Sequence, residues 1–194
     1  MIVDSDTHIN EPMEAFEQFL EEPYTSRRPR VIKDTLGLTR ILMEGRLYPD
    51  PRLKQAHAKQ IEGTRMGGIY AGATDPQARL KDLDLDGVGV QVIYGSLGLA
   101  LSTLADKDFA VAMSRACNNY YAHFCSANPD RLKCMATLPA QDIPAAVAEM
   151  RRAIKEVGCI GITLPPNVNG KNLDHPDFYP VYEEAQSLGI PIAI

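Results

Sequence analysis

The sequence predicts an α/β fold of the eight-stranded βα-barrel (TIM-barrel) type, of which the 194 residues carry about the first five strands. Short apolar segments rich in β-branched residues alternate with longer amphipathic segments, which is typical of a parallel sheet. No Gly-x-Gly-x-x-Gly motif follows the first apolar segment, which weakens the alternative of a doubly wound open sheet. The fifth apolar segment runs to the last residue. A buried strand there would lack a partner, so we expect the chain to be part of a longer fold.

The five strands are expected to begin near residues 2, 88, 133, 159 and 190. The second strand follows Gly87 and is apolar and β-branched. Pro139 closes the third strand, and Pro165 with Pro166 stops the fourth, because proline cannot donate to a strand ladder. The last four strands are predicted over residues 88–94, 133–138, 159–164 and 190–194.

Helices are predicted where apolar residues recur at helical spacing between the strands. Asp106 or Asp108 can cap the longest of them, and Asp142 can cap the next, because an aspartate side chain accepts a hydrogen bond from the first free amides. Gly158 and Gly189 follow the last periodic residues, in the position where a helix commonly ends on a left-handed residue. The helices are expected over residues 78–85, 106–126, 142–158 and 178–188.

Residues 22–77 interrupt this alternation. The segment is rich in proline, glycine and charge, and a connection of this length inside a compact domain is usually functional. We expect an insertion between the first and second strands that lies over one end of the sheet and contains short helices near 52–62. The sequence shows no internal repeat, so residues 1–194 are predicted to form a single, incomplete βα-barrel domain.

Composition excludes several classes of protein. The chain is 45% hydrophobic and 23% charged, with a net charge of −5 and no basic cluster of the kind that binds nucleic acid. No apolar run reaches the ~18 residues that span a membrane, and no signal peptide is recognisable. The four cysteines form no Cys-x-x-Cys pair. We therefore expect buried free thiols and a cytoplasmic protein.

The first strand runs into Asp4, Asp6 and His8, one on every second residue. Alternate side chains of a strand share a face, so these three are predicted to lie on the same side. A carboxylate and an imidazole two residues apart are half of a divalent-metal site. The alternative is a strand that ends in a polar turn, with His8 solvated or bonded to the backbone.

Two further motifs accompany this opening. The three segments are Asp4–Pro12 (DSDTHINEP), Arg79–Tyr94 (RLKDLDLDGVGVQVIY) and Gly170–Tyr182 (GKNLDHPDFYPVY). In this order they resemble the amidohydrolase superfamily, specifically the branch of aminocarboxymuconate-semialdehyde decarboxylase. The resemblance covers nearly the whole chain.

The resemblance implies a metal-dependent hydrolase fold, a distorted βα barrel with one divalent metal at its mouth. By position, Asp6 and His8 are the two metal ligands of the first strand. Zinc is the expected metal, and manganese is possible because a carboxylate at residue 6 favours a harder ion. The remaining ligands and the general acid or base are expected beyond Ile194. The family implies a decarboxylase or a hydrolase acting on a small carboxylic acid or carbonyl substrate, and a possible homodimer; the alternative is an inactive fragment or binding scaffold.

Other polar residues are candidates for the substrate pocket, because loops after barrel strands build such pockets. Asp4 is expected to support the metal ligands from deeper on the same face. Glu11 can reach the site or cap the next helix. For direct substrate contact the candidates are Ser96, Gln141 and Asn167, and Arg46 and Arg52 of the insertion could pair with a substrate carboxylate.

Overall fold

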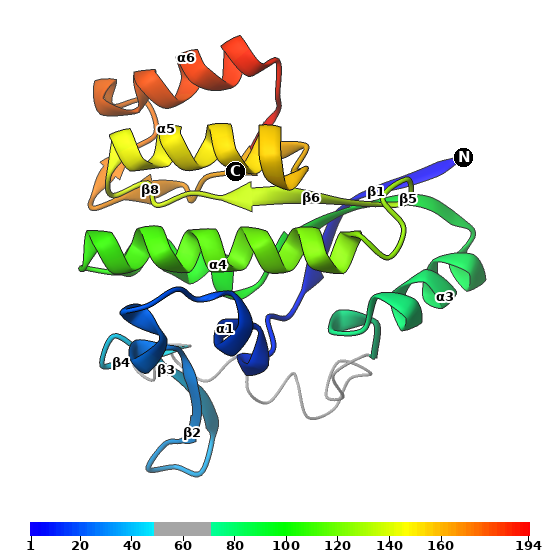
Figure 1. Cartoon of the computed structure of the whole chain (residues 1–194), viewed down its shortest axis with the longest axis horizontal. Coiled ribbons are helices and arrows are strands. Elements are labelled where there is room, and N and C mark those ends of the chain that lie inside the picture. Colours follow the sequence, from blue (N-terminus) through cyan, green and yellow to red (C-terminus); the bar gives the residue numbers. More distant parts are fainter. Residues whose placement is uncertain (49–70) are drawn as a thin grey trace.

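The computed structural model describes residues 1–48 and 71–194, and its centre is a curled parallel sheet of five strands (Figure 1). The strand order β1-β5-β6-β7-β10 follows the chain, as in the first part of a βα barrel. All five predicted strands are confirmed. They are β1 (Ile2–Ile9), β5 (Val88–Gly95), β6 (Leu132–Thr137), β7 (Gly161–Thr163) and β10 (Ile192–Ala193).

Helices connect the strands and cover one face of the sheet. In Figure 1, α4 and α5 flank β6, α6 lies beyond α5, and α1 lies beside α4 on the other side. The predicted helices are confirmed, and α5 continues into a single π turn, η5 (Ala153–Val157). The α-helices are α1 (Met13–Phe19), α3 (Pro76–Asp86), α4 (Lys107–Cys125), α5 (Ile143–Arg152) and α6 (Tyr179–Leu188).

The predicted caps are present. The side chain of Asp106 accepts a hydrogen bond from the Phe109 amide at 3.1 Å, and that of Asp142 accepts one from the Ala145 amide at 3.1 Å. Gly158 and Gly189 have φ angles of 94° and 66°. Each glycine therefore ends its helix in the left-handed conformation that glycine adopts most easily.

The core lies between the sheet and the helices. Long side chains of α4 pack against buried residues of β5 and β6, and each large apolar side chain contributes about 1.5–3 kcal/mol through burial. The fully buried members include Ile93, Phe109, Met113, Tyr121 and Phe124. All four cysteines are buried free thiols, as predicted. Within the described part of the chain, no helix is long and apolar enough to cross a membrane.

The insertion contains an antiparallel sheet that the sequence analysis did not predict. It consists of β2 (Arg30–Lys33), β3 (Thr39–Met43) and β4 (Arg46–Tyr48). Glu44 and Gly45 both have positive φ, which suits the tight turn between β3 and β4. The Glu44 carboxylate accepts hydrogen bonds from the amides of Ala105 and Asp106, both at 2.8 Å, and so fixes this sheet against the start of α4. The helices expected near 52–62, and Arg52, lie outside the described residues.

Short elements complete the connections. Among them, η4 follows β5 directly and borders the carboxyl end of the central sheet. The elements are η1 (Tyr24–Arg27), η3 (Ala71–Ala73), η4 (Leu97–Thr103), β8 (Asn167–Val168), β9 (Lys171–Asn172) and η6 (Pro176–Phe178).

Candidate metal and substrate site at the carboxyl ends of the strands

The carboxyl ends of the five strands share one edge of the sheet because all of the strands are parallel. In barrel folds this edge carries the functional loops. Here it is bordered by the β1–α1 connection, by η4 and by the loops after β6 and β7. The candidate residues divide into charged groups on β1 and neutral groups near β6 and β7.

Asp6 and His8 lie on the same face of β1. The Oδ1 atom of Asp6 is 3.9 Å from Nε2 of His8, and the two side chains are 87% and 45% exposed. Both point away from the apolar core, so they are available to a ligand. Both residues lie inside β1, so no polar turn begins before His8, whereas the partly exposed His8 side chain is solvated as that alternative expected.

Asp4 does not share that face, and the prediction that it does is wrong. Between Asp4 and Thr7, β1 advances three residues while β5 advances two, so the ladder is bulged there. The Oδ2 atom of Asp4 accepts a hydrogen bond from Nε2 of Gln91 at 3.2 Å, and Gln91 lies on the same face as the buried Ile93. Asp4 therefore faces the helices, because the extra residue reverses the alternation.

Tyr94 belongs to the site, although the sequence analysis did not single it out. It is the register partner of His8 on β5, and the two ring centroids are 5.9 Å apart. Burial raises the pKa of Tyr94, and the nearby charge of Asp6 raises it further. The phenol thus stays protonated beside the carboxylate and can donate a hydrogen bond. The sequence feature that could have identified Tyr94 was its position at the end of a predicted strand.

Arg79 supports the backbone of this site from α3. Its Nη2 atom donates to the carbonyl oxygen of His8 at 2.8 Å, and its Nε atom donates to that of Gly72 at 2.6 Å. Burial lowers the pKa of Arg79, while the charges of Asp82 and Asp4 raise it. The guanidinium therefore ties the end of β1 to the helix that precedes β5.

The donor pair fits a divalent metal in chemistry and nearly in geometry. A carboxylate oxygen and an imidazole nitrogen are accepted by both zinc and manganese. Two ligands of one tetrahedral ion, each about 2.1 Å from it, lie about 3.4 Å apart, so a small side-chain rotation brings Asp6 and His8 to that separation. Among residues 1–48 and 71–194, no group of three or more histidine, cysteine or acidic side chains could hold a metal.

Glu11 neither reaches this face nor caps α1. Its Oε2 atom accepts a hydrogen bond from the Leu97 amide at 2.8 Å, and Oε1 accepts from the Gly98 amide at 3.1 Å. The Tyr121 hydroxyl donates to Oε1 at 2.6 Å. Burial raises the pKa of Glu11, and these hydrogen bonds oppose that effect. Glu11 is thus a buried anchor for the start of η4.

The three residues predicted to contact substrate lie at this edge, but in different settings. Ser96 precedes η4, and its backbone amide donates to the carbonyl of Ile9 at 3.0 Å. Gln141 is buried, and its Nε2 atom donates to the carbonyls of Leu101 and Leu104, so it supports η4. Asn167 is exposed on β8. Substrate contact by any of the three stays a prediction.

A small hollow lies at the neutral side of the edge. Its internal volume is about 10 Å³, which is room for about one water molecule. Its wall is made by η4 and by the ends of β6 and β7. The lining residues are Gly98, Leu99, Ser102, Thr137, Leu138, Thr163 and Pro165.

Comparison with known proteins identifies the family. The family model described as amidohydrolase matches residues 3–194. The chain belongs to the amidohydrolase family. It is 34% identical over 134 residues to 2-amino-3-carboxymuconate-6-semialdehyde decarboxylase of Dictyostelium discoideum, covering 69% of this chain and 37% of the relative. It is 29% identical over 142 residues to gamma-resorcylate decarboxylase of Rhodococcus jostii, covering 68% and 43%.

Solved structures confirm the amidohydrolase fold. An amidohydrolase from Mycobacterium avium subsp. paratuberculosis matches with a TM-score of 0.73 at 18% identity, over 98% of this chain and 56% of that one. The 5-carboxyvanillate decarboxylase of Novosphingobium aromaticivorans, solved with bound manganese, matches with a TM-score of 0.65 at 21% identity, over 99% and 49%. The chain thus spans about half the length of these structures, and less than half of the two relatives above.

Proposed function

We propose that this amidohydrolase-family chain carries part of the active site of a metal-dependent decarboxylase acting on a small, hydroxylated or unsaturated carboxylic acid. The observation that carries the proposal is the pairing of Asp6 and His8 on one open face of β1. The relatives support the reaction class, since several are named as decarboxylases of such acids.

Asp6 and His8 would hold the metal. A bound divalent ion supplies positive charge that orients the substrate carboxylate and stabilises developing negative charge. The carboxylate of Asp6 permits manganese as well as the zinc that we expect, and manganese is named for the 5-carboxyvanillate decarboxylase structure.

Tyr94 would donate a hydrogen bond to the substrate beside this pair, because it is the register partner of His8 and the two ring centroids are 5.9 Å apart. Loss of carbon dioxide leaves an electron pair on the substrate carbon, which must take up a proton. Among residues 1–48 and 71–194 we assign neither that general acid nor a third metal ligand. Catalytic zinc sites use about three protein ligands, and the described residues offer two.

That same count favours a second candidate function. With no more than the two ligands found among the described residues, the protein would be a binding scaffold of the family, with no catalysis of its own. A hydrolase is the other alternative of the reaction class.

The buried free thiols favour a reducing compartment such as the cytoplasm. A homodimer is compatible with the family.

Metal analysis and product analysis test the proposal. The purified protein should bind about one zinc or manganese ion per chain, and Asp6→Ala and His8→Ala should each lower metal affinity at least tenfold. Asp130→Ala and His123→Ala are matched controls, because both residues are exposed and lie outside the site. With 2,6-dihydroxybenzoate, the metal-loaded protein should release carbon dioxide and resorcinol. Retained metal in both site variants contradicts the metal site, and ester hydrolysis without carbon dioxide release favours the hydrolase.

A further inference from the structure

Arg79 of α3 binds two backbone carbonyls beside the metal-ligand pair. Its Nη2 atom donates to the carbonyl oxygen of His8 at 2.8 Å, and its Nε atom donates to that of Gly72 at 2.6 Å. Successive carbonyls of a strand point in opposite directions, and the Ile9 carbonyl accepts from the Ser96 amide on the β5 side. The His8 carbonyl therefore points away from β5, and the guanidinium supplies the donor that β5 cannot supply.

The short segment η3, in which the insertion returns to α3, is bound to the same end of β1 by a second contact. The Asn10 amide donates to the Ala73 carbonyl at 2.9 Å. A Cβ atom at Gly72 would lie 2.6 Å from Oδ2 of Asp82 and 3.0 Å from Cα of Arg79. The close approach of η3 to α3 therefore requires glycine at this position.

The guanidinium is itself held in a fixed orientation. Its Nη1 atom donates to Oε1 of Gln91 at 3.4 Å, and Nε2 of Gln91 donates to Oδ2 of Asp4 at 3.2 Å. All three nitrogens of Arg79 are thus engaged, and a planar guanidinium bound in this way has little freedom to rotate. A displacement of η3 or of α3 is consequently passed on to the peptide of His8.

The orientation of that peptide determines where the imidazole lies relative to Asp6. The Nε2 atom of His8 is 3.9 Å from Oδ1 of Asp6. A metal site requires its ligands to be held to within about 0.5 Å of their working positions. Partners that orient metal ligands commonly change metal affinity about 10-fold to 100-fold when they are removed. A tilt of the peptide at His8 is therefore enough to spoil the pair.

We propose that Arg79 is a positioning residue that fixes the His8 imidazole opposite Asp6, and that through η3 it couples this pair to the insertion. The inference rests on the proposed function for the role of the pair as metal ligands. It adds a residue outside the pair that controls its geometry, and a route by which the position of the insertion affects metal binding.

Arg131 is a matched control at the other end of β5. It donates to the carbonyls of Val88 and Gly89 at 2.8 and 3.1 Å, and to Oδ1 of Asp84 at 2.6 Å. Val88 lies six residues before Tyr94, which is about 20 Å along the strand. Arg131→Met therefore removes the same kinds of contact as Arg79→Met without touching the site.

Cobalt(II) is the metal probe, because its visible absorption reports the geometry of its ligands. Arg79→Met should raise the Kd for cobalt about tenfold and shift the absorption bands. Arg131→Met should change the Kd less than about twofold and leave the bands in place. Arg79→Lys should recover only part of the affinity, because an ammonium group lacks the fork that reaches both carbonyls.

Nuclear magnetic resonance follows the imidazole without any metal. The ring centroids of His8 and Tyr94 are 5.9 Å apart, so a movement of either ring changes the chemical shift of the His8 Hε1 proton. In a proton–carbon spectrum at one fixed pH, this resonance should move in Arg79→Met and stay in place in Arg131→Met. His8→Ala identifies the resonance by its loss.

Gly72→Ala tests the coupling to the insertion while leaving the Arg79 side chain unchanged. The added methyl group pushes η3 away from the backbone of Arg79, which cannot turn aside. The His8 resonance should move, and the affinity for cobalt should fall by less than in Arg79→Met. Ala71→Ser, at an exposed residue of the same segment, is the control and should change neither.

The outcomes separate this inference from the proposed function. An unchanged His8 resonance or an unchanged cobalt Kd in Arg79→Met overturns the positioning role, and so do equal changes in Arg131→Met. An unchanged resonance in Gly72→Ala overturns the coupling to η3. If the wild type binds no cobalt but the His8 resonance moves in Arg79→Met alone, the positioning role is supported and the metal-dependent function is overturned.

Discussion

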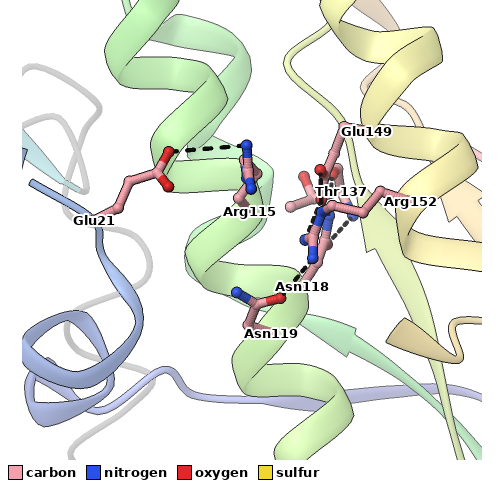
Figure 2. Close-up of polar contacts among 7 residues, drawn as sticks. All are labelled: Glu21, Arg115, Asn118, Asn119, Thr137, Glu149 and Arg152. Atoms are coloured by element: carbon pink, nitrogen blue, oxygen red, sulfur yellow. Dashed lines mark hydrogen bonds and ion pairs between the residues drawn. The ribbon is translucent and has the colours of Figure 1, made fainter. Parts of the chain in front are cut away.

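Replacement of Asn118 by alanine should destabilise the protein strongly, because this side chain forms hydrogen bonds with the backbone of β6 beyond the last residue that pairs with β5. The β5–β6 ladder ends at Ile93 and Cys134. Three residues further on, Nδ2 of Asn118 donates to the Thr137 carbonyl at 3.0 Å, and the Thr137 amide donates to Oδ1 of Asn118 at 2.9 Å. Figure 2 shows Asn118 reaching from α4 to Thr137 and to Glu149 of α5.

The size of the effect follows from the bonds that are lost. Two of them are neutral amide bonds, each with a net contribution of about 1 kcal/mol. The third, from Nδ2 to Oε1 of Glu149 at 2.7 Å, joins a buried carboxylate that Arg152 also binds through two nitrogens. A bond to a charged group contributes about 1.5–3 kcal/mol, so Asn118→Ala should lower the free energy of unfolding by about 4 kcal/mol. That is a large part of the roughly 5–15 kcal/mol of a typical domain.

Asn119 provides a matched control on the next residue. It makes one side-chain bond, accepting at Oδ1 from Nη1 of Arg152 at 2.9 Å, and it is only partly buried (Figure 2). Asn119→Ala should therefore cost about 1 kcal/mol or less. Urea unfolding followed by circular dichroism measures both variants. If Asn118→Ala costs no more than Asn119→Ala, the assignment of Asn118 as a backbone partner of β6 is refuted.

Two further predictions concern buried titratable groups. Burial raises the pKa of Glu11 above its ordinary 4.5, so its protonated form favours folding, and this contribution is present below pH 4.5 and is lost as the pH rises through the raised pKa. The unfolding free energy of the wild type minus that of Glu11→Gln should accordingly fall as the pH rises above about 4.5, since burial keeps the facing Tyr121 and Cys117 neutral. A flat or rising difference in urea titrations contradicts this. All four thiols should resist 5,5′-dithiobis(2-nitrobenzoate) in the native protein and react after unfolding, and rapid native labelling would contradict their burial.

Much of the central sheet could be predicted because its signals are local. Each of the last four predicted strands is largely apolar and has glycine or proline at one end or both, and the caps at Asp106 and Asp142 act within a few residues of the chain. The sheet of the insertion was missed although the apolar residues 41–43 and 47–48 lie on either side of a turn at Glu44 and Gly45. The high proline and glycine content of residues 22–77 favoured irregular structure, so this short hairpin pattern was not recognised.

The site was harder to predict because its geometry depends on contacts between distant segments. The spacing of Asp6 and His8 was sufficient to place them together, but the bulge that turns Asp4 toward Gln91 has no local signature. The role of Glu11 depends on η4, more than eighty residues later, whose amides it binds. Alternation along one strand cannot reveal either contact.

The contact between Glu11 and η4 also explains how Asp6 and His8 on β1 keep their position relative to the hollow beside η4. His8 and Glu11 belong to one short segment, in which His8 faces the candidate metal and Glu11 holds η4. Tyr94, the partner of His8, is followed within four residues by Gly98, which Glu11 binds. A shift of β1 along β5 would therefore move the metal ligands and the wall of the hollow together. The position of Asp6 and His8 relative to η4 thus depends on the β1–β5 register, which Glu11 supports through the amides of η4 and Arg79 supports through the His8 carbonyl.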